Sequence, residues 1–295
     1  MKEIFIILSC VPLYVVNSFC DKQISTKNKN SYNYLYNFLK FLIASICFFV
    51  ICMTDDAPKF GIGTICCGLA NGIMLALSKI AVLKGYEKSS VAFISLCHGA
   101  GMLIPCIIGH FFWNEKINLA SMIGLLIIVV SVWFLKGSIA EKTKKIGSSL
   151  ILGFFVFVLS GGIMVSQKCM GLYFKNESAS AYNFYGFFVA FLILSVFVSL
   201  KSNNKLNEDK NLQIFKKGKE VFVCAIGSGV SLCIISLVMT LLAGKVPSII
   251  MFPLFNGLGI ILVCIATAVF FKEKLTPKKI IGVLLGLGGL CLMNI

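Results

Sequence analysis

Two polar side chains stand deep inside long apolar runs, and each is followed by a Gly-x-Gly. They are His98 and Asn256, which occupy matching positions 158 residues apart. A polar group at the centre of a bilayer is costly, so it marks a functional site by default. The neighbouring glycines remove side-chain bulk beside it. We therefore expect His98 and Asn256 to contact a substrate, and the alternative is a hydrogen bond between helices.

Three further polar residues are candidates for the same substrate-binding site. Asn71 lies in the middle of an apolar run, whereas Asn17 and Gln167 lie nearer the ends of theirs. We predict that all three contact the substrate, with interhelical hydrogen bonding again as the alternative.

The charged residues are predicted to avoid the membrane interior. Lys79 and Lys168 lie near the ends of apolar runs, where a lysine can extend its amine to the headgroups. Asp21 is assigned to a polar loop over residues 21–32. An exporter of lipophilic cations usually keeps a carboxylate within the membrane, so this distribution disfavours that class of transporter.

The apolar runs form an internal repeat, which bears directly on the architecture. Residues 90–131 align without a gap on residues 248–289, so that Glu115-Lys116 matches Glu273-Lys274. We interpret each pair as the start of the last helix of a unit, where an acid complements the helix dipole. A functional acid in each unit is the alternative.

The composition predicts an all-α integral membrane protein. Of the 295 residues, 58% are hydrophobic and 13% are charged, whereas about a quarter are charged in a soluble domain. Apolar runs recur at lengths that can cross a bilayer. They indicate about ten transmembrane helices in two repeats of five, residues 1–137 and 146–295. Because five is odd, the second repeat is inverted, a common design of secondary transporters.

Several classes of function are excluded. The formal net charge of +15 comes from lysines that cluster in loops. This distribution favours contact with anionic lipid headgroups over binding to nucleic acid. We find no nucleotide-binding loop and no zinc pattern among the 13 cysteines. A membrane-embedded enzyme would need clustered acids or histidines, and the only histidines are His98 and His110. We therefore predict no cofactor, no metal and no enzymatic activity.

The order of these features resembles the EamA-type transporters of the drug/metabolite transporter superfamily. The resemblance covers nearly the whole chain and is carried in both units by a serine, a Glu-Lys pair and a glycine: Ser90, Glu115-Lys116 and Gly124, then Ser248, Glu273-Lys274 and Gly282. It implies two inverted five-helix units that move small organic molecules. One departure is that Pro105 in the fourth span is matched by valine at position 263.

These observations together predict a secondary-active transporter of small organic metabolites, amino-acid-like or related, that works by alternating access. The alternatives are a multidrug exporter of lipophilic cations and a non-transporting accessory protein. The expected partners are a small-molecule substrate, the lipid bilayer and a coupling proton or ion. The sequence is also compatible with a homodimer. Lysines crowd the side opposite the termini, so the positive-inside rule places the termini outside the cell (inner) membrane.

Overall fold

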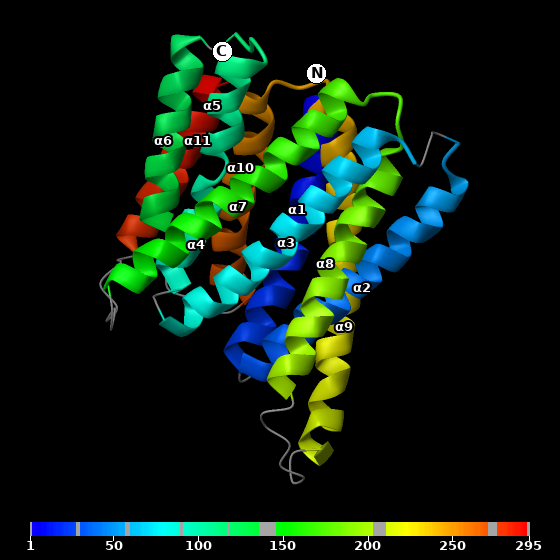
Figure 1. The fold of residues 1–295 in the computed structure, drawn as a ribbon. Helices are drawn as coiled ribbons and strands as arrows, with labels where there is room; N and C mark the ends of the chain where they lie inside the picture. The colour runs from blue at the N-terminus through cyan, green and yellow to red at the C-terminus, as the bar shows by residue number, and fades with distance from the viewer. Residues whose placement is uncertain are drawn as a thin grey trace.

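The computed structural model describes residues 2–27, 30–56, 60–88, 91–116, 118–135, 146–202, 211–270 and 276–293, and all regular structure within them is helical. The helices are α1 (Lys2–Lys27), α2 (Asn30–Thr54), α3 (Ile62–Lys88), α4 (Val91–Ala100), α5 (Leu103–Phe112), α6 (Leu119–Leu135), α7 (Ile146–Tyr173), α8 (Ala179–Ser202), α9 (Asn211–Ala243), α10 (Ser248–Phe270) and α11 (Pro277–Met293). They form a bundle whose two termini lie at the same end (Figure 1), called the terminal end below.

The expectation of about ten transmembrane helices is confirmed. Within the described residues, eight segments are long and apolar enough to cross a membrane, and two shorter apolar helices over 119–134 and 280–292 accompany them. α4 and α5 together make one of the eight. An even number of crossings returns the chain to the end where it began, as Figure 1 shows.

The packing of the helices follows the inverted repeat. α3 packs on α7 and α8, and in the same way α9 packs on α1 and α2. α2 also contacts its equivalent α8, and α6 contacts its equivalent α11. A two-fold axis between the units produces such an exchange of contacts. The link between the units, residues 136–145, lies outside the described residues.

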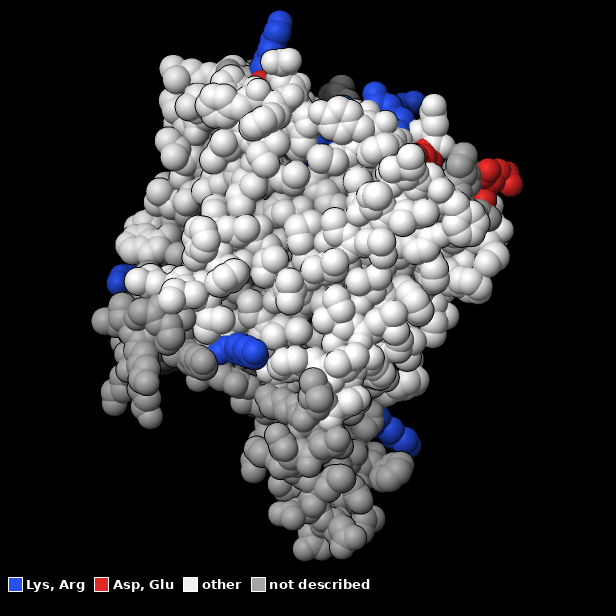
Figure 2. Space-filling view, in the orientation of Figure 1, with Lys and Arg blue, Asp and Glu red and all other residues white. Residues whose placement is uncertain are grey.

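The outer surface is suited to lipid. On the face shown in Figure 2, charged side chains lie towards the two ends, and the band between them is uncharged. Large apolar side chains such as Leu126, Phe154 and Leu284 are more than half exposed. Helices satisfy their own backbone hydrogen bonds, so they can present these side chains to hydrocarbon.

Two boundaries differ from the sequence prediction. The loop predicted over residues 21–32 is largely helical, because α1 continues to Lys27 and α2 begins at Asn30. The predicted fourth span is broken between α4 and α5. At the break the Ser160 hydroxyl of α7 donates to the His98 carbonyl at 3.0 Å, and a side chain at Gly101 would overlap Ser160. α7 therefore packs directly against the backbone at the break.

α7 and the end of α9 touch through two glycines. A Cβ at Gly171 would overlap the backbone of Gly244, and the reverse also holds. We expect Gly171→Val to lower the free energy of unfolding by about 1–3 kcal/mol, the usual cost of overpacking. Thermal unfolding in detergent measures the change. The control is Gly288→Val, because a Cβ at Gly288 in α11 meets nothing within 4 Å. Equal losses in both variants would contradict a specific contact.

Candidate functional site

A lysine and an aspartate pair inside the bundle, between α1 and α2. The Lys40 side chain is 1% exposed, and its Nζ lies 2.8 Å from Asp21 Oδ1. The same ammonium donates to Asn17 Oδ1 at 2.5 Å, and the Tyr36 hydroxyl donates to Asp21 Oδ1 at 2.6 Å. These four residues are called the ionic cluster below. It joins α1 to α2 by charge-assisted hydrogen bonds.

The ionic cluster lies at the edge of the membrane-spanning region, because Asp21 is the last residue of the candidate span Lys2–Asp21. Lys40 is seven residues into the candidate span Asn33–Thr54, about 10 Å along the helix axis. The prediction of a loop at Asp21 is wrong, because α1 continues to Lys27 through the segment assigned to that loop. The sequence held a signal for the cluster: Asn17 and Asp21 are four residues apart, as are Tyr36 and Lys40, so each pair shares a helix face.

A second ion pair joins the two units at the terminal end. Lys168 on α7 is 2% exposed, and its Nζ lies 2.8 Å from Glu115 Oε1 in the connection between α5 and α6. The Glu115 carboxylate also accepts hydrogen bonds from Ser248, from the backbone N–H at 2.7 Å and from the hydroxyl at 3.3 Å. Lys168 donates to the Val246 carbonyl at 2.7 Å. These four residues are called the terminal latch below.

The terminal latch corrects two sequence interpretations. Glu115 does not start the last helix of its own unit: α6 begins at Leu119, and Asn118 Oδ1 accepts a hydrogen bond from the Ser121 N–H at 2.6 Å. Glu115 instead satisfies a backbone N–H at the start of α10, which has no partner within its own helix. Lys168 is buried rather than directed to the headgroups. The repeat-related pair Glu273-Lys274 lies outside the described residues.

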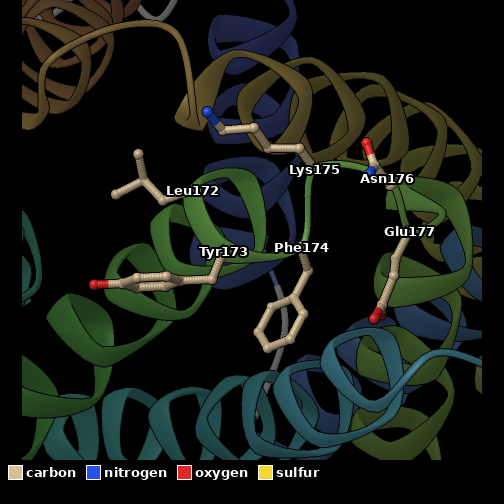
Figure 3. A pocket seen from close by; sticks show the side chains of 6 residues that line it. All are labelled: Leu172, Tyr173, Phe174, Lys175, Asn176 and Glu177. Atoms are coloured by element: carbon tan, nitrogen blue, oxygen red, sulfur yellow. The ribbon is translucent and has the colours of Figure 1, made fainter.

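Two further polar contacts join the units at the same end. Asp55 Oδ2, in the connection between α2 and α3, accepts hydrogen bonds from the hydroxyls of Ser178 and Ser180 at 2.6 and 2.5 Å. The Glu177 carboxylate accepts from the Thr64 N–H at 2.6 Å and from the Thr64 hydroxyl at 2.8 Å. Glu177 thereby caps the first turn of α3, towards which its side chain points in Figure 3.

A shallow hollow of about 440 Å³ lies beside this cap, and it is lined by residues 172–177 (Figure 3). All six lining residues come from one short segment at the end of α7 and the connection that follows it. The hollow therefore belongs to the surface of the terminal end and not to a path through the membrane.

The Glu177 cap makes stability depend on pH. Burial works against ionisation, but the hydrogen bonds from Thr64 and Gly63 outweigh it and hold the pKa of Glu177 below its ordinary value. A lowered pKa stabilises the fold above the unfolded pKa, and this stabilisation is lost as the pH falls through the folded pKa. We expect Glu177→Gln to cost about 1 kcal/mol at neutral pH. The difference from wild type should begin to shrink as the pH falls below about 4.3, the ordinary pKa of a glutamate, and should vanish below the folded pKa.

Thermal unfolding of both proteins in detergent, from neutral pH to about pH 3, measures this difference. Asp56→Asn is the control, because Asp56 is an exposed carboxylate at the same end. A difference between wild type and Glu177→Gln that stays constant with pH would rule out the cap as its cause.

The two residues predicted deepest in the membrane are both half-buried. His98 lies in the last turn of α4, beside the break before α5. Asn256 lies in α10, where its Nδ2 donates to the Phe252 carbonyl of the same helix at 3.0 Å. Neither observation tests whether these two residues bind a substrate, which stays a prediction.

The other three predicted residues lie in different surroundings. Asn17 belongs to the ionic cluster. Gln167 is buried on α7, directly before Lys168 of the terminal latch. Asn71 is buried on α3, where its Nδ2 lies 2.8 Å from the place a Cβ at Gly186 of α8 would take. The contacts of Asn17 and Asn71 thus place them in separate parts of the bundle.

Buried polar side chains line the region where α3, α7, α8 and α9 pack on one another. The Ser166 hydroxyl of α7 donates to the Cys67 carbonyl of α3 at 3.1 Å and lies 3.1 Å from the Tyr182 hydroxyl of α8. The Asn183 amide of α8 donates to Thr240 Oγ1 of α9 at 3.1 Å. These hydrogen bonds join α3, α7, α8 and α9 within the membrane.

Comparisons with known proteins agree with this arrangement. A family model described as the EamA-like transporter family matches residues 1–137 and 144–295. No curated protein matches the chain. A crystal structure described only as that of a protein aligns over 99% of this chain and 96% of that chain, with 13% identity and a TM-score of 0.73. At that identity the likeness shows the fold alone.

Proposed function

Because the chain belongs to the EamA-like transporter family, we propose that it is a secondary-active transporter of small organic metabolites that works by alternating access. The chain is a multi-pass membrane protein, and its family consists of transporters. We place the protein in the cell (inner) membrane with its termini outside, on the basis of the lysine distribution.

The observation that carries the proposal is the way in which the two units meet at the terminal end. The terminal latch, the Asp55 contacts and the Glu177 cap all run from one unit to the other. A solute can pass this end only if such contacts break. Inverted repeats allow the two units to rock against each other, which would open this end while the other closes. With the termini outside, the described state is closed towards the outside.

The ionic cluster bears on the class of solute. A lipophilic-cation exporter needs a carboxylate in the membrane that is free to bind either the cation or a proton. Asp21 lies at the end of its candidate span, and Lys40 and Tyr36 already engage it. The geometry therefore favours a metabolite transporter over the multidrug alternative. Transport would be driven by a coupling proton or ion.

A two-stage experiment tests the proposal. Purified protein is first screened with a metabolite library for thermal stabilisation, and each stabilising solute is then tested for counterflow in liposomes. We expect at least one solute to stabilise the protein and to exchange across the membrane. A solute that binds without counterflow would indicate a non-transporting accessory protein. Absence of both binding and counterflow across the library would also count against a metabolite transporter.

A further inference from the structure

We propose that Asn71 and Asn183 form a binding site for a group of the solute that carries N–H donors, such as a primary amine or a carboxamide. The proposal rests on the proposed transport function, because it assigns part of the solute site. It starts from two amide oxygens. Asn71 is 1% exposed and Asn183 is 0% exposed, and the Oδ1 of each has no hydrogen-bond partner among the described residues.

Two such oxygens point to a missing ligand. Buried polar groups in native proteins are nearly always hydrogen-bonded, and an unpaired one costs the free energy of its desolvation. Within the membrane that cost is not relieved by bulk water. An acceptor without a partner is retained there most readily if a bound molecule donates a hydrogen bond to it.

The two amides approach the same stretch of α8. Asn71 on α3 lies against Gly186, where the missing side chain leaves room for its amide. Asn183 lies three residues before Gly186 on α8, which is about 4.5 Å along the helix axis. α3 and α8 are held close by Gly72, because a Cβ there would meet the Gly186 carbonyl at 2.5 Å. The proposed site lies between these two amides, on either side of less than one turn of α8.

The hydrogen-bonding state of Asn183 selects the chemistry of the ligand. Its Nδ2 already donates to the Ala179 carbonyl at 2.8 Å and to Thr240 Oγ1 at 3.1 Å. Both donors of that amide are used, so Asn183 can only accept. A carboxylate has no proton to give and cannot complete the two oxygens, whereas a primary ammonium has three N–H donors and a carboxamide has two.

The first test needs no solute. Asn71→Leu replaces the amide that carries the unpaired oxygen with an apolar side chain of similar size, so we expect the thermal unfolding temperature of the ligand-free protein to rise by about 2–4 °C. The matched control is Asn37→Leu, since Asn37 is also a buried asparagine on a helix but its Nδ2 donates to the Asn33 carbonyl at 2.7 Å. We expect no gain from the control. A loss of stability in Asn71→Leu would overturn the proposal.

The second test uses pairs of solutes that differ in N–H donors but keep their charge: ethanolamine against choline, and glycine against glycine betaine. We expect the N–H member of a pair to raise the unfolding temperature of the wild type more than its trimethylated counterpart, and this preference to disappear in Asn71→Leu. Equal effects within both pairs, or a preference kept by Asn71→Leu, would overturn the site. Binding with this preference but without counterflow would keep the site and reject the transport function.

Discussion

Replacing Asp21 with leucine is expected to lower the free energy of unfolding by about 3 kcal/mol, the cost of leaving a buried charge without its partner. Lys40 would stay buried, and the Asn17 amide oxygen would be its remaining hydrogen-bond acceptor in the ionic cluster. The Lys40 ammonium itself is 1% exposed, so bulk water cannot take the place of the lost carboxylate beside it. Thermal or denaturant unfolding of the purified variant measures the loss.

The double variant Asp21→Leu/Lys40→Met separates charge pairing from packing. It removes both charges and keeps apolar side chains in their place, so we expect it to recover most of the stability. Lys40→Met alone should cost less than Asp21→Leu, because the Asp21 side chain is 37% exposed and can stay hydrated. If the double variant were as unstable as Asp21→Leu, the loss would come from packing and not from the unpaired charge.

Lys168→Met is expected to loosen the terminal end and so to raise the amide hydrogen exchange of the first turn of α10 at least tenfold. Glu115 would lose its counter-ion at a site where it is 11% exposed and would keep only its hydrogen bonds from Ser248. Breaking a buried pair from one side costs about 3 kcal/mol, and each 1.4 kcal/mol corresponds to a factor of ten. Exchange measured by mass spectrometry in lipid nanodiscs reports the change.

Two variants control this result. Lys245→Met removes an exposed lysine from the same end of the bundle and should leave the exchange of α10 unchanged. Glu115→Gln/Lys168→Met removes both charges but keeps an amide oxygen that can accept from Ser248, so it should exchange more slowly than Lys168→Met. Unchanged exchange in Lys168→Met would show that the terminal latch does not hold this end closed.

The repeat and the membrane class could be predicted because both depend on residue type along the chain. Apolar runs of this length form helices in a bilayer, because a helix satisfies the hydrogen bonds of all its backbone groups within one segment. The match of residues 90–131 to residues 248–289 then indicates two equivalent units. The helix contacts, in which α3 packs on α7 and α8 as α9 packs on α1 and α2, follow the same equivalence.

The residues of the charged sites were harder to predict, because their environment depends on which helices meet. The segment 21–32 is polar enough to be interpreted as a loop. In the structure Asp21 belongs to α1, and its carboxylate pairs with Lys40 and accepts a hydrogen bond from Tyr36 on the neighbouring helix. Lys168 has the position of an interfacial lysine along its own helix. Its burial depends on Glu115 and Val246, which come from other parts of the chain.

The same limit applies to the polar residues that the sequence singled out for chemistry. Their depth in the apolar runs was visible from the sequence, because hydrophobic patterning reports how a segment meets the lipid. Whether an amide is hydrogen-bonded depends on which residues lie near it in space. Asn256 bonds to its own helix, whereas Asn71 lies against Gly186 with an unpaired oxygen. The sequence by itself determined the helices, the repeat and the candidate polar positions. Only the tertiary structure decided which charges and amides are paired, because those pairings are made between helices that the repeat alone does not bring together.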